Sequence, residues 1–313
     1  MDAILAPIMW VVAWIMYGSH QFFTLIGFPD GPGVAWILSI VALTVMMRAA
    51  MIPLFVKQIR SSRAMQILQP ELQAIQKRYK GKSDPASREA MSRETMDLYK
   101  KHGTNPFSSC MPILLQSPIF FALFRVLANI TNVAAGTHDA IGPIHQQVAQ
   151  DIEGTSLFGA HLSDVFMTTG STTARVVIIV LIVLMSATTF FTQRQLTMKN
   201  MPKAALEGPQ ANMQKMMLYA MPLIFAVSGV NFPLGVLIYW TTTNVWSMGQ
   251  QFYTINRMPA PGSPAEKALL EKKARKAAAK GKDLTEEQEL LLNPTPRGQR
   301  TQPVRKNRRK KKG

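Results

Sequence analysis

Long uninterrupted apolar blocks dominate the pattern of hydrophobic and polar positions in this chain. A bilayer core about 30 Å thick is spanned by about 20 helical residues, because each residue adds about 1.5 Å. Five blocks meet or approach that length, at residues 34–56, 107–130, 174–193, 216–232 and 233–253. Short alternating stretches and internal repeats do not occur. The pattern therefore predicts membrane-spanning helices rather than a barrel of strands.

An earlier apolar block, at residues 3–28, has a different character. Residues that are polar or that break helices interrupt it, namely Pro7, Gly18, Ser19, His20 and Gln21. It lacks the basic start and the small-residue cleavage site of a signal peptide. A helix in the outer interface, with Trp10 and Trp14 at headgroup level, fits this pattern best, and residues 1–33 then form an interfacial helix and a turn. A sixth span is the alternative.

Residues 57–106 separate the first two spans and predict a helical hairpin. Apolar residues recur there at steps of three and four, at Met65, Leu68, Leu72, Ile75 and Tyr79. This spacing is typical of a narrow coiled-coil seam. A second helix is expected from about residue 86 to 101. The hairpin is too small for a core of its own. It is either a solvated loop folded on itself or a platform for an incoming chain or an anionic membrane surface.

The distribution of basic residues predicts the orientation. Residues 1–47 and 131–173 contain no Lys or Arg, residues 57–101 contain eleven, and the chain after residue 254 contains seventeen. Positively charged loops stay on the cytoplasmic side. We therefore expect five spans in a cell membrane, with residues 131–173 outside and with the hairpin and the C-terminus in the cytoplasm.

The C-terminal region, residues 256–313, is rich in Ala, Lys, Glu and Pro and is expected to be disordered. It ends in a basic cluster that consists of Arg305, Lys306, Arg308, Arg309, Lys310, Lys311 and Lys312. Such a cluster attracts acidic lipid or the phosphates of ribosomal RNA. Aromatic residues that would stack on bases do not interleave with it, so reading of a nucleic-acid sequence is not expected.

Composition argues against catalysis and against bound cofactors. Of the 313 residues 47% are apolar, and the formal net charge is +17. The single cysteine, Cys110, excludes an intramolecular disulfide and a CxxC site. No nucleotide-binding glycine motif occurs, and the five histidines lack metal-ligand spacing. We expect no enzyme activity, no metal and no cofactor.

Arg48 is the most informative residue, because it lies inside the first apolar block. It precedes the expected cytoplasmic end by eight positions, or roughly 12 Å. An arginine at such depth costs about 2.5 to 3.5 kcal/mol on insertion scales unless it is solvated or paired. No span contains a carboxylate that could pair with it. Snorkelling to the headgroups is one explanation. A hydrated, positively charged groove is the other.

Polar residues on several predicted spans favour the groove. Each of them alone is commonly satisfied by its own helix or by a neighbouring one. Together with an unpaired arginine, they predict a water-filled wall. The candidates for this wall are Thr44, Gln116, Ser117, Gln193, Trp240, Thr243 and Asn244.

Several segments in the same order resemble the YidC membrane protein insertase family. They are Met47-Arg48-Ala49-Ala50-Met51-Ile52-Pro53-Leu54, the run from Ser61 to Glu71, the run from Asn105 to Phe120, and Phe232-Pro233-Leu234-Gly235-Val236-Leu237-Ile238-Tyr239-Trp240. The likeness covers roughly residues 7 to 255, and the Ala/Lys-rich tail resembles actinobacterial members.

The resemblance implies an all-α polytopic membrane protein. Five transmembrane helices, residues 34–255, would surround a hydrophilic groove, with an interfacial helix before them and a cytoplasmic helical hairpin inserted. The family's groove arginine matches Arg48, and Gln116 and Trp240 match other groove positions. The implied function is an insertase and chaperone for nascent membrane proteins, acting alone or with the Sec translocon. The ribosome and the lipid bilayer are the further expected partners.

An anion transporter or channel, with Arg48 as its selectivity charge, is the alternative function. A transporter needs a path to both sides of the membrane and commonly shows inverted repeats. This chain shows no repeat, and the predicted outer loop has no basic residue to receive an anion. A scaffold that binds the ribosome or lipid through the tail is a third and weaker hypothesis.

Overall fold

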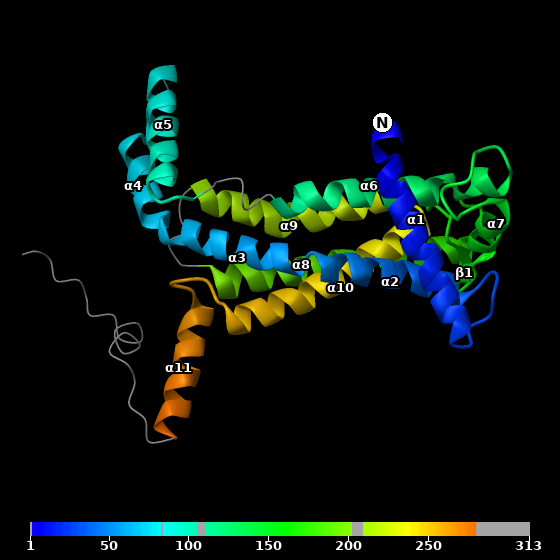
Figure 1. The fold of residues 1–313 in the computed structure, drawn as a ribbon. Helices are drawn as coiled ribbons and strands as arrows, with labels where there is room; N and C mark the ends of the chain where they lie inside the picture. The colour runs from blue at the N-terminus through cyan, green and yellow to red at the C-terminus, as the bar shows by residue number, and fades with distance from the viewer. Residues whose placement is uncertain (1, 83, 105–110, 202–208, 280–313) are drawn as a thin grey trace, which may run out of the picture.

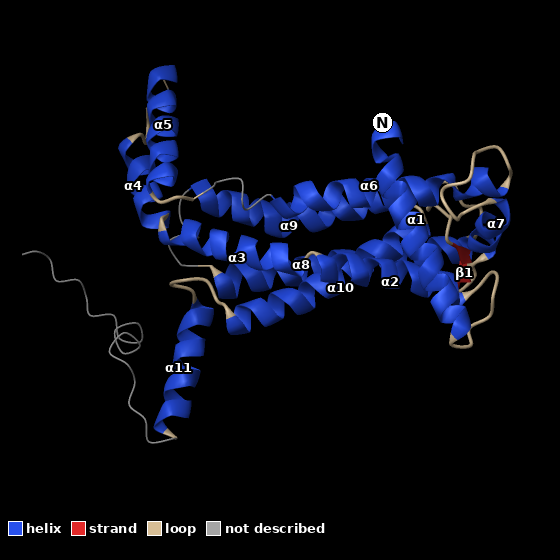
Figure 2. Cartoon of the chain, in the orientation of Figure 1, coloured by secondary structure: helices blue, strands red, loops and turns tan. Residues whose placement is uncertain are grey.

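A computed structural model describes residues 2–82, 84–104, 111–201 and 209–279 of the chain. Most of these residues are helical, as Figure 2 shows. Long helices form an extended bundle, in which α3 follows α2 end to end (Figure 1). They are α2 (Val34–Ala50), α3 (Ile52–Ile67), α6 (Met111–Ala134), α8 (Thr172–Asn200), α9 (Pro209–Gly229) and α10 (Leu234–Arg257).

The first predicted span is bent. Helices α2 and α3 follow each other with only Met51 between them, and their axes differ by 48°. Pro53 lies in the first turn of α3. It has no N–H to donate to the preceding turn, and its ring would crowd a carbonyl there. The bend therefore falls one turn after Arg48.

Two of the described helices are long and apolar enough to cross a membrane, at Gln116–Ala134 and Thr172–Asn200. The bent pair of α2 and α3 adds a third if it counts as one span. Helices α9 and α10 have 21 and 24 residues, but they carry more polar side chains. The predicted helical membrane architecture is thus present, and assigning α9 and α10 as spans remains a proposal.

Helix α1 (Asp2–Leu25) crosses the bundle at a steep angle over α2 and α6 (Figure 1). It continues through Pro7 and Gly18, so the breaks that the sequence indicated do not occur. Val12, Ala13 and Met16 are fully buried against the bundle. Trp10 and Trp14, in contrast, are exposed. Helix α1 is thus buried along one side and exposed along the other, and its interfacial position stays a prediction.

The apolar core occupies the half of the bundle that α1 covers. Gly235 allows α10 to approach its neighbours there, because a Cβ atom would lie 3.1 Å from Leu127 and 3.4 Å from Ile40. Buried side chains from α2, α6, α8 and α10 fill this half, among them Trp36, Ile40, Leu43, Leu123, Val126, Leu127, Ile178, Leu234 and Val236.

Residues 131–173 cap this end of the bundle. They contain α7 (Gln146–Gly154) and two antiparallel strands, β1 (Ser156–Leu157) and β2 (Ala160–His161), in which Ser156 pairs with His161. The strands were not expected from the sequence. Their loop holds the start of α10, since the carbonyl oxygen of Asp164 accepts from the Leu234 N–H at 2.9 Å.

The predicted hairpin projects from the other end of the bundle (Figure 1). It consists of α4 (Gln69–Arg78) and α5 (Pro85–Lys101), which meet through Leu72, Ile75 and Leu98. The expected seam is interrupted, because Met65 belongs to α3 and the chain turns at Leu68. Tyr79 donates a hydrogen bond to Glu94 at 2.8 Å, and this bond raises the pKa of the tyrosine.

One part of the C-terminal region is helical, which corrects the expectation that residues 256–313 are disordered throughout. Helix α11 spans Pro264–Ala278. Ser263 caps it by accepting a hydrogen bond from the Glu266 N–H at 3.2 Å, and a Ser cap before a Pro in the first turn is a start signal that the sequence contained. The basic cluster at residues 305–312 lies outside the described residues.

Candidate functional site

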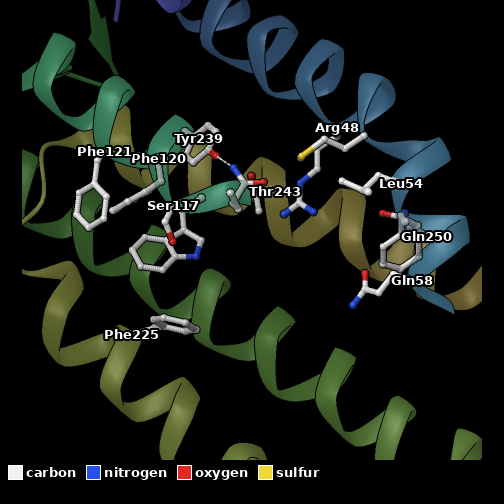
Figure 3. Close-up of a pocket in the computed structure, with 14 residues that line it drawn as sticks. Arg48, Leu54, Gln58, Ser117, Phe120, Phe121, Phe225, Tyr239, Thr243 and Gln250 are labelled. Carbon is white, nitrogen blue, oxygen red and sulfur yellow. Dashed lines mark hydrogen bonds between the residues drawn. The ribbon is translucent and has the colours of Figure 1, made fainter. Parts of the chain in front are cut away.

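A groove of about 420 Å³ opens in the half of the bundle beyond the apolar core. Helices α2, α3, α6, α9 and α10 contribute to its wall, as Figure 3 shows. Its lining residues are Arg48, Met51, Leu54, Phe55, Gln58, Gln116, Ser117, Phe120, Phe121, Phe225, Tyr239, Trp240, Thr243 and Gln250.

Arg48 supplies the charge of this groove. Its side chain is partly buried, and its Nε atom has no hydrogen-bond partner among the described residues. The groove lining contains no Asp or Glu. A buried donor without a partner costs about 1 to 3 kcal/mol, so water or an incoming polar group is favoured next to it. The groove therefore presents an uncompensated positive charge.

Gln116 and Tyr239 join two walls of the groove. The amide Nε2 of Gln116, on α6, donates a hydrogen bond to the hydroxyl of Tyr239, on α10 (Figure 3). The other amide atom, Oε1, has no partner among the described residues. This acceptor and the Arg48 donor thus give the groove both kinds of polar group.

An aromatic cluster forms the end of the groove next to the core. The ring of Trp240 lies 4.8 Å from that of Phe225 and 5.2 Å from that of Phe120. Both contacts are edge-to-face, a geometry that favours aromatic pairs. In Figure 3, Arg48 lies between this cluster and the side chains of Gln58 and Gln250. The groove therefore has its aromatic cluster at one end and two amide side chains beside Leu54 at the other.

Five of the predicted wall residues line the groove: Arg48, Gln116, Ser117, Trp240 and Thr243. Three others do not. The hydroxyl of Thr44 donates to the carbonyl of Ile40 in its own helix at 2.7 Å. Asn244 faces α8, where it donates to the carbonyl of Met185 at 3.1 Å. Gln193 also lies outside the groove lining.

The sequence interpretation missed Tyr239, Gln58 and Gln250. Gln250 lies seven residues after Thr243, which is two helical turns, so helical spacing could have identified it. Tyr239 is adjacent to Trp240 in the chain, but its hydrogen-bond partner, Gln116, belongs to another helix. The pattern along α10 alone therefore does not identify Tyr239. Gln58 was assigned to the hairpin, because the apolar block ends at residue 56. Instead, α3 continues past that point and carries Gln58 to the groove.

Groups of three or more His, Cys, Asp or Glu side chains with the geometry of a metal site do not occur among the described residues. Two titratable side chains line the groove, those of Arg48 and Tyr239. With a cation, amides, hydroxyls and aromatic rings, the lining suits binding of a polar or acidic segment together with apolar side chains.

Comparison with known proteins identifies the family. The family described as 60Kd inner membrane protein matches residues 28–261. The chain is 44% identical over 290 residues to the membrane protein insertase YidC of Streptomyces avermitilis, an alignment that covers 90% of the chain and 65% of that relative. It is 39% identical over 320 residues to the membrane protein insertase YidC of Bifidobacterium longum, covering 98% of the chain and 95% of the relative.

Among solved structures, the chain is similar to an active YidC insertase with its first transmembrane domain resolved. The TM-score is 0.45 at 20% identity, over 81% of this chain and 46% of the other. The family match and the two relatives cover most of the chain, and the relatives include actinobacterial sequences. The chain therefore belongs to the YidC family of 60Kd inner membrane proteins.

Proposed function

We propose that the chain is a membrane protein insertase and chaperone of the cell membrane. It binds nascent membrane proteins in a hydrated groove that carries Arg48, alone or together with the Sec translocon. The observation that supports this most directly is an arginine in a groove of the helical bundle whose lining holds no carboxylate. The printed names of the two relatives, membrane protein insertase, agree with it. The activity is binding and partitioning, without bond-making and without a cofactor.

The proposed topology has five spans. The bent pair of α2 and α3, followed by α6, α8, α9 and α10, would cross the membrane, and the loop at residues 131–173 would lie outside. Helix α10 is less apolar than a typical span because one face, with Thr243 and Gln250, lines the groove. Polar residues in a span are tolerated where they face a water-filled cavity. The polarity of α10 is thus compatible with a spanning position.

The proposed mechanism follows from charge and hydration. A nascent membrane protein carries a polar segment that must cross apolar surroundings before its apolar helix enters the lipid. Water in the groove lowers the cost of the first step. The Arg48 charge, in a partly low-dielectric cavity, attracts a carboxylate more strongly than it would in bulk water. The aromatic cluster around Trp240 then provides an apolar contact for the following helix.

The packing of the outer half favours an insertase over an anion transporter. Ile40, Leu123 and Leu234 are at most 1% exposed, and they lie between the groove and the loop at residues 131–173. A transporter would have to open this apolar layer in every cycle. An insertase needs access from the cytoplasm and from lipid alone, so the packed layer can stay closed.

Substitution of Arg48 tests the function. Two substrates that differ only in an acidic or a neutral outer segment are inserted by matched amounts of each variant. Arg48→Lys keeps the charge and is expected to retain much of the activity. Arg48→Glu is expected to reduce insertion of the acidic substrate at least tenfold and that of the neutral substrate less. Arg194→Glu, an exposed position on α8 outside the groove lining, is the matched control. Equal insertion of both substrates by Arg48→Glu would contradict the mechanism.

The basic cluster of the tail and the hairpin are proposed contacts with the ribosome or with acidic lipid. Residues 297–313 hold nine of the seventeen basic residues that follow residue 254. Their removal is expected to weaken co-sedimentation with ribosomes or with anionic vesicles, most at low salt, because clustered cations act through phosphate attraction. Unchanged co-sedimentation with both ribosomes and vesicles would mean that the cluster serves only to keep the tail on the cytoplasmic side.

A further inference from the structure

A second crevice, of about 400 Å³, lies between α8 and α10 on the opposite side of α10 from the groove. Helix α10 turns about 100° per residue, so Phe252, nine residues after Thr243, points in the opposite direction. Phe252 lines the crevice, whereas Thr243 lines the groove. The two sites are thus separate surfaces of one helix.

Apolar side chains line the part of this crevice that lies further from the C-terminal ends of the two helices. They are exposed on the surface of the bundle. Phe191 of α8 is 54% exposed, and Met248 and Phe252 of α10 are 41% and 68% exposed. Exposed apolar side chains continue along both helices, at Val183 of α8 and Val245 of α10. In the proposed membrane position, lipid chains and not water surround such side chains. This part of the crevice has the character of a binding surface for hydrocarbon.

The end of the crevice is polar and carries a cation. Lys199 and Asn256 lie eight residues beyond Phe191 and Met248 on their helices, or roughly 12 Å further along the axis. Lys199 forms no ion pair among the described residues. In the proposed orientation, both residues are at the cytoplasmic surface. An apolar slot that ends in a free ammonium group matches the shape and charge of a phospholipid with an anionic headgroup.

Gly249 leaves the space open. A Cβ atom at this position would meet no atom within 4 Å, so no neighbouring side chain occupies the place next to it. Gly249 also lines an apolar crevice of about 430 Å³ on its other side, against α3. A glycine in a helix interior is less favourable than an alanine. Here the missing side chain of Gly249 leaves open space between the crevice against α8 and the crevice against α3.

We propose that the crevice between α8 and α10 binds a phospholipid of the cytoplasmic leaflet. Its acyl chain lies along Phe191, Met248 and Phe252, and its anionic headgroup contacts Lys199. This inference goes beyond the proposed function and rests only on the proposed orientation. It concerns a resident lipid and not the inserted chain.

Native mass spectrometry of the full chain in detergent with phosphatidylglycerol tests the charge. Lys199→Gln is expected to lower the occupancy of retained phosphatidylglycerol about fivefold, the effect of one lysine next to anionic headgroups. It should not change the occupancy of phosphatidylcholine. Lys215→Gln removes a lysine that is also exposed, from α9 outside the crevice, and is expected to leave both occupancies unchanged. Equal losses in the two variants would overturn the site, because the lysine would then act only through general positive charge.

Gly249→Phe tests the slot itself. The added ring fills open space, so the fold should survive, and retention of both lipids is expected to fall. Unchanged retention would overturn the proposal. A photoreactive residue at Phe252 in phosphatidylglycerol vesicles distinguishes the occupants, since a lipid adduct supports the site and a crosslink to a nascent chain in its place contradicts it. Failure of the Arg48 experiment with normal lipid retention would affect the insertase mechanism alone.

Discussion

Asn244 of α10 donates a hydrogen bond to Thr189 of α8, with 2.9 Å between Nδ2 and Oγ1. The same amide group donates to the carbonyl of Met185 at 3.1 Å. Helix α10 contributes a wall to the groove and to the crevice between α8 and α10. This pair of bonds therefore fixes α10, and with it a wall of both sites, against α8.

Removal of these bonds is expected to loosen the contact between α8 and α10. Asn244→Leu should lower the free energy of unfolding by about 0.5 to 1.5 kcal/mol, since polar contacts between membrane helices contribute about that much. Thr189→Val removes one partner and should cost less. Unfolding in mixed micelles, with Ser247→Ala on the same helix as control, measures the difference. An effect of Asn244→Leu equal to that of Ser247→Ala would contradict the role of these bonds.

Two glycines of α10 are expected to respond oppositely to alanine. Gly235→Ala places a methyl group 3.1 Å from Leu127 in the packed outer half, so the thermal midpoint should fall by several degrees. Gly249→Ala meets no atom within 4 Å and improves helix propensity, so the midpoint should stay constant or rise. Thermal unfolding of the two variants in the same detergent is the measurement. A larger loss at Gly249 would refute this assignment of close and open packing.

The proposed orientation predicts opposite labelling of two exposed positions. Lys82, at the tip of the hairpin, and Asp139, in the loop at residues 131–173, are both exposed. In a Cys110→Ala background, a cysteine at Asp139 should react with an impermeant thiol reagent in intact cells. A cysteine at Lys82 should react only in inverted vesicles. Labelling of both from one side would exclude an odd number of spans between them.

The start of α5 is expected to depend on pH. Asp84 accepts a hydrogen bond from the Ser87 N–H at 2.8 Å, and this bond lowers the pKa of the carboxyl. A lowered pKa in the folded state means that the stabilisation is present above the ordinary pKa of 3.8 and is lost as pH falls through the folded value.

Hydrogen exchange of the Ser87 amide in the full chain measures this cap. Asp84→Ala should speed exchange at neutral pH, relative to Asp97→Ala, which alters an exposed position within α5. The difference between the two variants should vanish in strong acid. A difference that stays constant over the whole pH range would mean that the carboxylate charge does not act as the cap.

The sequence by itself determined the elements whose cause is local. Apolar blocks of membrane length predict α6 and α8, helical spacing predicts the apolar contacts of α4, and the helix expected from about residue 86 to 101 corresponds to α5. Arg48 could also be identified, because the absence of a carboxylate from every apolar block is a property of the sequence. Each of these features depends on a few neighbouring residues, so no knowledge of distant contacts is needed.

Only the tertiary structure decided which polar side chains meet in the groove. Thr44, Thr243 and Asn244 are similar polar interruptions of apolar helices, yet the first bonds to its own backbone, the second lines the groove, and the third joins α10 to α8. Their fates depend on how far each helix is rotated about its axis. Close packing at contacts such as Gly235 with Leu127 sets that rotation. Because these partners are far apart in the chain, the local pattern of polar positions contains no record of them.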